Sequence, residues 1–132
     1  MTPKSLADLH AVVFETPQPW SEAAFEKLLK QPNISLFTAP HGFALISQND
    51  YEIELLTIAV DPKHHRTGLA SQLMDDIMNM AADRPLILEV AADNHAAIAL
   101  YRKFGLSEIA RRPRYYRTPT GSRIDAIVMK SS

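Results

Sequence analysis

The stretch from residue 51 to residue 90 constrains the fold more than any other part of the chain. Residues 51–60 start as a strict polar–apolar alternation and then become apolar on both faces. This change predicts a strand that runs from a half-solvated position into the buried middle of a sheet. A helical apolar repeat over residues 67–82 and a short apolar strand over residues 86–90 follow. A strand, a helix and a strand in this order predict a parallel strand pair inside a mixed sheet.

Capping and turn residues divide the rest of the chain into further elements. Thr2 and Ser21 can each cap a helix in the N-terminal part, and Asn94 can cap one that stops at Gly105. The predicted strands outside the central stretch are residues 34–39, 42–47, 106–112 and 123–130. The sequence therefore predicts an α/β (α+β) fold in one domain over residues 1–132. Its central sheet is mixed and mostly antiparallel, with about six strands flanked by about four helices.

The composition is that of an ordinary globular domain. The chain has 132 residues, of which 46% are hydrophobic and 22% are charged, enough for one buried core. The net charge of −1 gives no overall field that would draw the chain to nucleic acid or to a membrane surface. The absence of cysteine excludes disulfides, thiol nucleophiles and thiolate metal ligands. Because we find no secretory pattern behind Met1 and no apolar run of about 20 residues, we expect a cytoplasmic protein without a membrane partner.

Residues 60–71 form the segment that says most about function. A buried strand ends, a basic loop follows and a helix begins, and a helix start offers unpaired N–H groups and a partial positive charge to an anion. Gly68 permits a close backbone approach to such an anion, Ala70 is small, and Arg66 adds a guanidinium. The alternative is a plain strand-to-helix turn that needs glycine for its geometry. The glycine spacings of the phosphate-binding loop and of the dinucleotide fingerprint are both missing.

Two other features suggest sites that we do not favour. His64 and His65 are adjacent, so their side chains diverge, and no third ligand stands at a useful spacing. We therefore expect no metal ion. Arginines interleaved with Tyr115 and Tyr116 between residues 111 and 123 are typical of some RNA-binding surfaces. A solvated hairpin that lines a substrate cleft explains the same pattern, and the near-neutral charge favours it, so we expect no nucleic-acid partner.

Two segments resemble a known family. Residues 58–62, followed by residues 65–70 and a helix, resemble the acetyl-CoA signature of the GNAT acetyltransferase superfamily, although His65 departs from the usual glutamine or arginine. Residues 88–90 and 94–105 resemble the RimI branch of that superfamily, whose members acetylate the N-terminal alanine of a small-subunit ribosomal protein. The resemblance spans nearly the whole chain and is strongest from residue 58 to residue 104.

This resemblance implies a GNAT-type domain that uses acetyl-CoA as its cosubstrate and holds no metal. In the family, main-chain amides of the loop wrap the CoA pyrophosphate, and the strand before the loop hydrogen-bonds to the pantetheine arm. The position of Asn94 matches a residue that also binds that arm. The residues that the resemblance assigns to the cosubstrate are Ile58, Ala59, Val60, Arg66, Thr67, Gly68, Leu69, Ala70, Ser71 and Asn94.

Glu89 and Tyr101 match the general base and the general acid of the RimI branch. An α-amino group titrates at about 7.7–8.0, so a base must take its proton before the nitrogen attacks the thioester. A phenol can then protonate the departing thiolate. The resemblance implies direct attack in a ternary complex, with a strand N–H near Val60 at the oxyanion. On the residues alone, Glu89 could equally be a solvent-facing strand carboxylate, and Tyr101 a core residue of its helix.

The acceptor amine stays open at this point. The resemblance implies the N-terminal α-amino group of a protein, above all of a ribosomal protein that begins with alanine. Ala91 and Asp93 replace an arginine and a serine that RimI sequences usually carry, and residues 113–114 are inserted. A lysine side chain or a small-molecule amine is the alternative acceptor, and a non-catalytic acetyl-CoA-binding module is the alternative function. We expect a monomer or a weak dimer.

Overall fold

The structure is a computed structural model that describes residues 1–65 and 67–132. Within these residues, four α-helices and one short 3₁₀ helix accompany one six-stranded sheet. The elements in chain order are α1 (Pro3–Val13), α2 (Glu22–Leu29), β1 (Ile34–Ala39), β2 (Gly42–Gln48), β3 (Ile53–Val60), η1 (Pro62–His64), α3 (Leu69–Ala81), β4 (Leu86–Ala91), α4 (His95–Lys103), β5 (Leu106–Arg117) and β6 (Arg123–Ser131). This succession confirms the predicted order of helices and strands, to which η1 is an addition.

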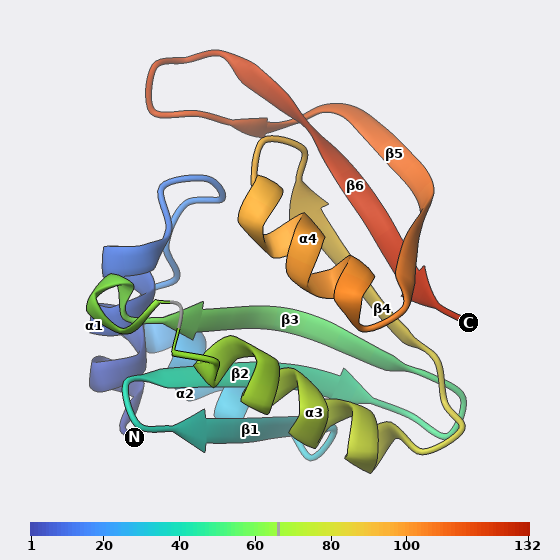
Figure 1. Cartoon of the computed structure of the whole chain (residues 1–132). Coiled ribbons are helices and arrows are strands. Elements are labelled where there is room, and N and C mark those ends of the chain that lie inside the picture. Colours follow the sequence, from blue (N-terminus) through green and yellow to red (C-terminus); the bar gives the residue numbers. More distant parts are fainter. Residues whose placement is uncertain (66) are drawn as a thin grey trace.

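The sheet has the strand order β1-β2-β3-β4-β6-β5, and β3 pairs with β4 in parallel. The other neighbours pair antiparallel, which confirms the predicted mixed and mostly antiparallel sheet. Residues 53–55 pair with residues 86–88, and beyond that point the two strands diverge (Figure 1). The register of β2 against β3 shifts between Leu45 and Ile46, so that Leu56 is an extra residue on β3. Such a bulge bends its strand, and it lies where the parallel pairing ends.

Helices cover both faces of the sheet, and each face has its own core. α1 and α2 pack on one face of the β1–β3 half, where Phe25 and Phe43 are fully buried. α3 and α4 pack on the opposite face, over a core that includes Ile77 and Tyr101 (Figure 1). In the described part of the chain, no helix lies behind β4, β6 and β5 on the α1–α2 side. None of the described helices has both the length and the apolar character needed to cross a membrane.

Two predicted elements have wrong boundaries, for local reasons. The strand predicted from residue 51 begins at Ile53, because the Asn49 side chain accepts the N–H groups of residues 51 and 52 and holds a turn there. The helix predicted over residues 67–82 spans only Leu69–Ala81. Gly68 and Ala82, which flank it, have φ angles of 82° and 55°, and positive φ cannot continue a right-handed helix.

The β5–β6 hairpin is longer than predicted. β5 continues to Arg117 instead of ending at residue 112. Its pairing with β6 is irregular between Arg112 and Tyr116, and regular pairing resumes afterwards. The inserted residues 113–114 are accommodated in this irregularity, where Arg114 has a φ of 53°. The insertion therefore lengthens the hairpin without ending the strand.

His10 is a buried polar residue that ties α1 to the sheet. The residue is 1% exposed. Its Nδ1 accepts the main-chain N–H of Trp20 at 3.1 Å, which places the ring proton on Nε2, 3.0 Å from Oγ1 of Thr57 on β3. The rings packed around it are Phe14, Trp20, Phe25 and Phe43. Burial lowers the pKa of His10 to about 4, so the ring is neutral near pH 7.

We expect His10 to make the fold sensitive to acid. Its pKa is about 4 in the folded chain against an ordinary value of 6.5, so between these pH values the unfolded chain binds more protons and stability falls as the pH falls. From about pH 7 to about pH 5, this residue should lower the free energy of unfolding by about 2 kcal/mol. Urea unfolding at both pH values should show a loss about 2 kcal/mol larger in wild type than in His10→Gln. An equal loss in both proteins would contradict this role.

Candidate active site

A cleft of about 1140 Å³ opens where β3 and β4 diverge. Its walls come from α1 and the segment after it, from β3, from the start of α3, from β4, from α4 and from β5. The predicted site residues that line it are Ile58, Val60, Gly68, Leu69, Ala70, Ser71, Glu89, Asn94 and Tyr101. Ala59 and Thr67 are not among the lining residues, and Arg66 lies outside the described residues. The structure thus brings most of the predicted site into one cavity.

The loop between β3 and α3 presents the start of a helix to the cleft. Gly68 is the N-cap of α3, and no side chain caps this helix. The first intrahelical bond runs from the N–H of Gln72 to the carbonyl of Gly68 at 2.9 Å, so the N–H groups of residues 69–71 have no partner inside the helix. Nζ of Lys103 on α4 lies 3.1 Å from Oγ of Ser71, which places a cation beside them. This arrangement suits a bound anion.

The edge of β3 that faces the cleft carries main-chain groups without a neighbouring strand. The N–H of Asp61 bonds across to the turn before β2 at 2.8 Å. Alternation along an antiparallel ladder then turns the main-chain groups of Ala59 toward β2 and those of Ile58 and Val60 toward the cleft. The carbonyl of Val60 lies 2.9 Å from Nε2 of His65, whereas the side chain of Ala59 packs in the α1–α2 core. An extended ligand arm can pair with this edge as another strand would.

Glu89 projects from the face of β4 that no described helix covers. The residues on either side of it are buried in the α3–α4 core, so alternation along the strand places Glu89 on the opposite face. Its side chain is 32% exposed, and its Oε1 lies 3.0 Å from Nε of Arg112 on β5. Glu54 on β3 is close enough to interact with Glu89. Burial raises the pKa of Glu54, and the charges of Glu89 and Glu52 raise it further. A carboxylate placed like Glu89 can hold a cation or accept a proton from one.

Tyr101 enters the cleft from the buried side of α4. The residue is 6% exposed, and burial, followed by the proximity of Tyr116, raises the pKa of its phenol. Tyr116 on β5 also lines the cleft, and burial first, then Glu89 and Tyr115, raise its pKa to about 12. The phenol of Tyr101 therefore stays protonated near neutral pH and can act as a proton donor.

Asn94 occupies the turn between β4 and α4. Its side-chain oxygen caps α4 by accepting the N–H of Ala97 at 3.2 Å, as predicted, and the residue lines the cleft. The cap uses the oxygen of the carboxamide, whose NH₂ group is a separate donor. Asn94 can therefore begin the helix and donate a hydrogen bond to a ligand at the same time.

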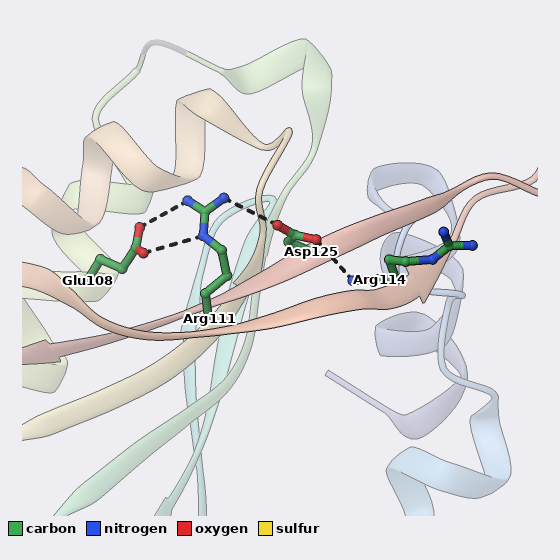
Figure 2. A network of polar contacts seen from close by, with 4 residues as sticks. All are labelled: Glu108, Arg111, Arg114 and Asp125. Atoms are coloured by element: carbon green, nitrogen blue, oxygen red, sulfur yellow. Dashed lines mark hydrogen bonds and ion pairs between the residues drawn. The ribbon is translucent and has the colours of Figure 1, made fainter.

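A network of charges fixes the hairpin beside the cleft (Figure 2). Arg111 binds the carboxylate of Glu108 at 3.2 Å and that of Asp125 at 3.3 Å. Asp125 also accepts the main-chain N–H of Arg114 at 2.9 Å, and this bond, together with the contacts from Arg111, lowers its pKa. The network joins β6 to the irregular part of β5, which continues into the tyrosines that line the cleft.

Several lining residues lie outside the set predicted from the sequence. Tyr116, Glu54 and Thr57 all face the cleft. The tyrosine pair that contains Tyr116 was visible as a motif, and Glu54 was visible as the polar residue of an alternating strand. The hairpin that carries Tyr116 was expected to line a substrate cleft, which agrees with the structure. The polar pattern around Glu54 does not indicate that its side chain reaches a cavity, because the cavity exists only where two strands separate.

Known proteins match this chain in sequence over most of its length. A sequence model described as the acetyltransferase (GNAT) family matches residues 6–106. N-alpha-acetyltransferase RimI of Mycobacterium tuberculosis is 34% identical over 133 residues, which cover 94% of this chain and 82% of that protein. The ribosomal protein bS18-alanine N-acetyltransferase of Escherichia coli strain K12 is 37% identical over 118 residues, which cover 84% of this chain and 79% of that protein.

The fold matches as well. The crystal structure of the ribosomal-protein-S18-alanine N-acetyltransferase from Escherichia coli superposes with a TM-score of 0.87 at 33% sequence identity. The superposition covers 98% of this chain and 86% of that one. Sequence and structure together confirm the resemblance inferred from residues 58–104. The chain therefore belongs to the acetyltransferase (GNAT) family, as a RimI-like member.

Proposed function

We propose that this protein transfers the acetyl group of acetyl-CoA to the N-terminal α-amino group of a protein. A ribosomal protein that begins with alanine is the first candidate acceptor. The observation that carries the proposal is the cleft, whose walls hold an uncapped helix start, an open strand edge, a carboxylate and a buried phenol. Membership of the family supports acetyl transfer, and the names of the RimI-type relatives support a protein N-terminus as the acceptor.

Acetyl-CoA would lie along the β3 edge with its pyrophosphate at the start of α3. The N–H groups of residues 69–71 would bind phosphate oxygens, and the ammonium of Lys103 would add a charge beside them. The pantetheine arm carries amides that can pair with the main chain of Ile58 and Val60 and with the side chain of Asn94. This path brings the thioester to the part of the cleft that Glu89 and Tyr101 line.

Gly68 offers a direct test of the phosphate site, with Gly121 as a matched control. Both glycines have positive φ, 82° and 87°, and a Cβ added at either would meet nothing within 4 Å. We expect Gly68→Ala and Gly121→Ala each to destabilise the fold by about 1–2 kcal/mol, since both force an L-residue into a left-handed conformation. Only Gly68→Ala should weaken acetyl-CoA binding, by roughly tenfold. Calorimetry that finds equal acetyl-CoA affinity in the two variants would place the phosphates elsewhere.

In the proposed reaction, Glu89 takes a proton from the acceptor ammonium, and the neutral nitrogen attacks the thioester carbon. A tetrahedral intermediate forms, whose oxyanion can be held by a main-chain N–H of the open β3 edge. The C–S bond then breaks, and Tyr101 gives its proton to the CoA thiolate. After the attack, the acceptor nitrogen carries a positive charge and one extra proton. The Tyr101 phenolate takes this proton, which leaves a neutral amide. Glu89 passes the proton that it took from the acceptor to solvent. Because the acceptor nitrogen attacks the thioester directly, no covalent acetyl-enzyme forms.

We expect Glu89→Gln and Tyr101→Phe each to lower kcat by about 10²–10⁴-fold, because each removes one proton-transfer group. Both variants should bind acetyl-CoA with wild-type affinity, since neither removes a group assigned to the pyrophosphate or the pantetheine arm. Steady-state thiol release and calorimetry measure the two quantities. Glu26→Gln and Tyr51→Phe are matched controls at exposed positions outside the cleft and should keep wild-type kcat. Wild-type turnover in both catalytic variants would remove the two assignments.

The acceptor is tested by a screen with mass detection of the acetylated product. The probes are a peptide that begins with alanine, as in ribosomal protein bS18, the same peptide with a blocked N-terminus and one internal lysine, and a polyamine. We expect acetylation of the free α-amino group, with kcat/KM at least about tenfold above that for the other amines. A product only on lysine or on the polyamine would move the assignment to the alternative acceptors. Acetyl-CoA binding without any product would favour a non-catalytic module.

A further inference from the structure

Glu89 is paired with a cation that reaches it from a distant strand. Nε of Arg112 lies 3.0 Å from Oε1 of Glu89. Arg112 belongs to β5 and Glu89 to β4, and β6 lies between these two strands in the sheet. Neighbouring strands are about 4.8 Å apart, so the side chains of Arg112 and Glu89 together span the width of β6 to make this contact. The contact lies over the face of the sheet that no described helix covers, where Val128 of β6 stands opposite Glu89.

The pair is nevertheless loosely held. The side chains of Arg112 and Glu89 are 57% and 32% exposed. Arg111, the preceding residue, donates hydrogen bonds to both Glu108 and Asp125. Arg112 makes an ion pair with Glu89 and lies 5.5 Å from the ring centre of Tyr115, with no side-chain hydrogen bond among the described residues. Exposed pairs of this kind are weak and are easily exchanged for another cation.

The surroundings of Glu89 favour such an exchange. The titratable groups that face it are Arg112 and Tyr116 from β5 and Glu54 from β3, while β6 contributes the apolar Val128. A second cavity of about 240 Å³ lies next to the pair, and its described lining includes three carboxylates but one cation, Arg112. When the Arg112 guanidinium leaves Glu89, it can therefore stay in the same cavity, beside the carboxylates of Glu52 and Glu54.

We infer that Arg112 is an internal substitute for the acceptor ammonium, which displaces it from Glu89 when the acceptor binds. The inference rests on the proposed function, in which Glu89 takes a proton from the amine. A guanidinium does not give up its proton to a carboxylate, whereas a primary ammonium can. The exchange of one cation for the other is thus what makes Glu89 a base. Arg112 therefore competes with the acceptor for Glu89 and takes no part in the proton transfer.

Removing this competitor should improve acceptor binding. We expect Arg112→Gln to lower KM for the alanine-starting peptide by about two- to fivefold, the range expected for loss of an exposed ion pair, with kcat unchanged. Arg112→Lys keeps a competing charge and should stay near the wild-type KM. Arg117→Gln removes a charge from the same strand at an exposed position outside both cavities, and it should leave KM unchanged. Titration of the CoA complexes with the peptide should give the same ranking in Kd.

A raised KM or a lowered kcat in Arg112→Gln would overturn the inference, because Arg112 would then hold Glu89 in its working position. If Arg112→Lys behaved like Arg112→Gln, the effect would come from stacking on Tyr115, and the inference would fail as well. The wild-type measurement separates this inference from the proposed function. Wild type that acetylates no peptide N-terminus contradicts both. Active wild type with an unchanged KM in Arg112→Gln contradicts this inference alone.

Discussion

The candidate site depends on the point where β3 and β4 stop pairing. Residues 53–55 and 86–88 form a short parallel ladder, and the extra residue at Leu56 bends β3 just beyond it. Each strand stays paired on its other side, β3 with β2 and β4 with β6, so the sheet can open without losing either half. The opened edge of β3 carries main-chain groups that must find water or a ligand, because leaving them unpaired and buried is unfavourable.

The alternation of β4 and the position of α4 bring to that opening the two groups to which we assign proton transfer in the proposed function. Glu89 stands on the face without a described helix and stays partly solvated, whereas its strand neighbours anchor β4 in the core. Tyr101 reaches the same cleft from the covered face, where burial keeps its phenol protonated. A carboxylate open to water can pass a proton to solvent, and a buried phenol can hold one for a leaving group. The divergence of the strands lets groups from opposite faces of one sheet line the same cleft.

Local patterns were enough to predict the elements that carry the site, whereas the roles proposed for Glu89 and Tyr101 came from the family resemblance. The change of pattern within residues 51–60 predicted a strand near the middle of the sheet, and the Asn94 cap was correct. The position of Ala59 was not predictable, since its main chain turns to β2 and its side chain to the core only because of the ladder register. The contact of Arg112 with Glu89 depends on the order β4-β6-β5, in which the last strand of the chain inserts between two earlier ones. No local pattern contains that order.

The bulge also links the site to the N-terminal helices. Leu55 packs in the α3–α4 core, and simple alternation would place Thr57 on the same face. Because Leu56 is an extra residue, Thr57 turns instead to the α1 side, where its hydroxyl meets the imidazole of His10 at 3.0 Å. Ile58 then returns to the α3–α4 side, and its main-chain groups point into the cleft. One inserted residue therefore anchors β3 to α1 and opens its edge to a ligand, so the packing of α1 and the geometry of the cleft cannot vary independently.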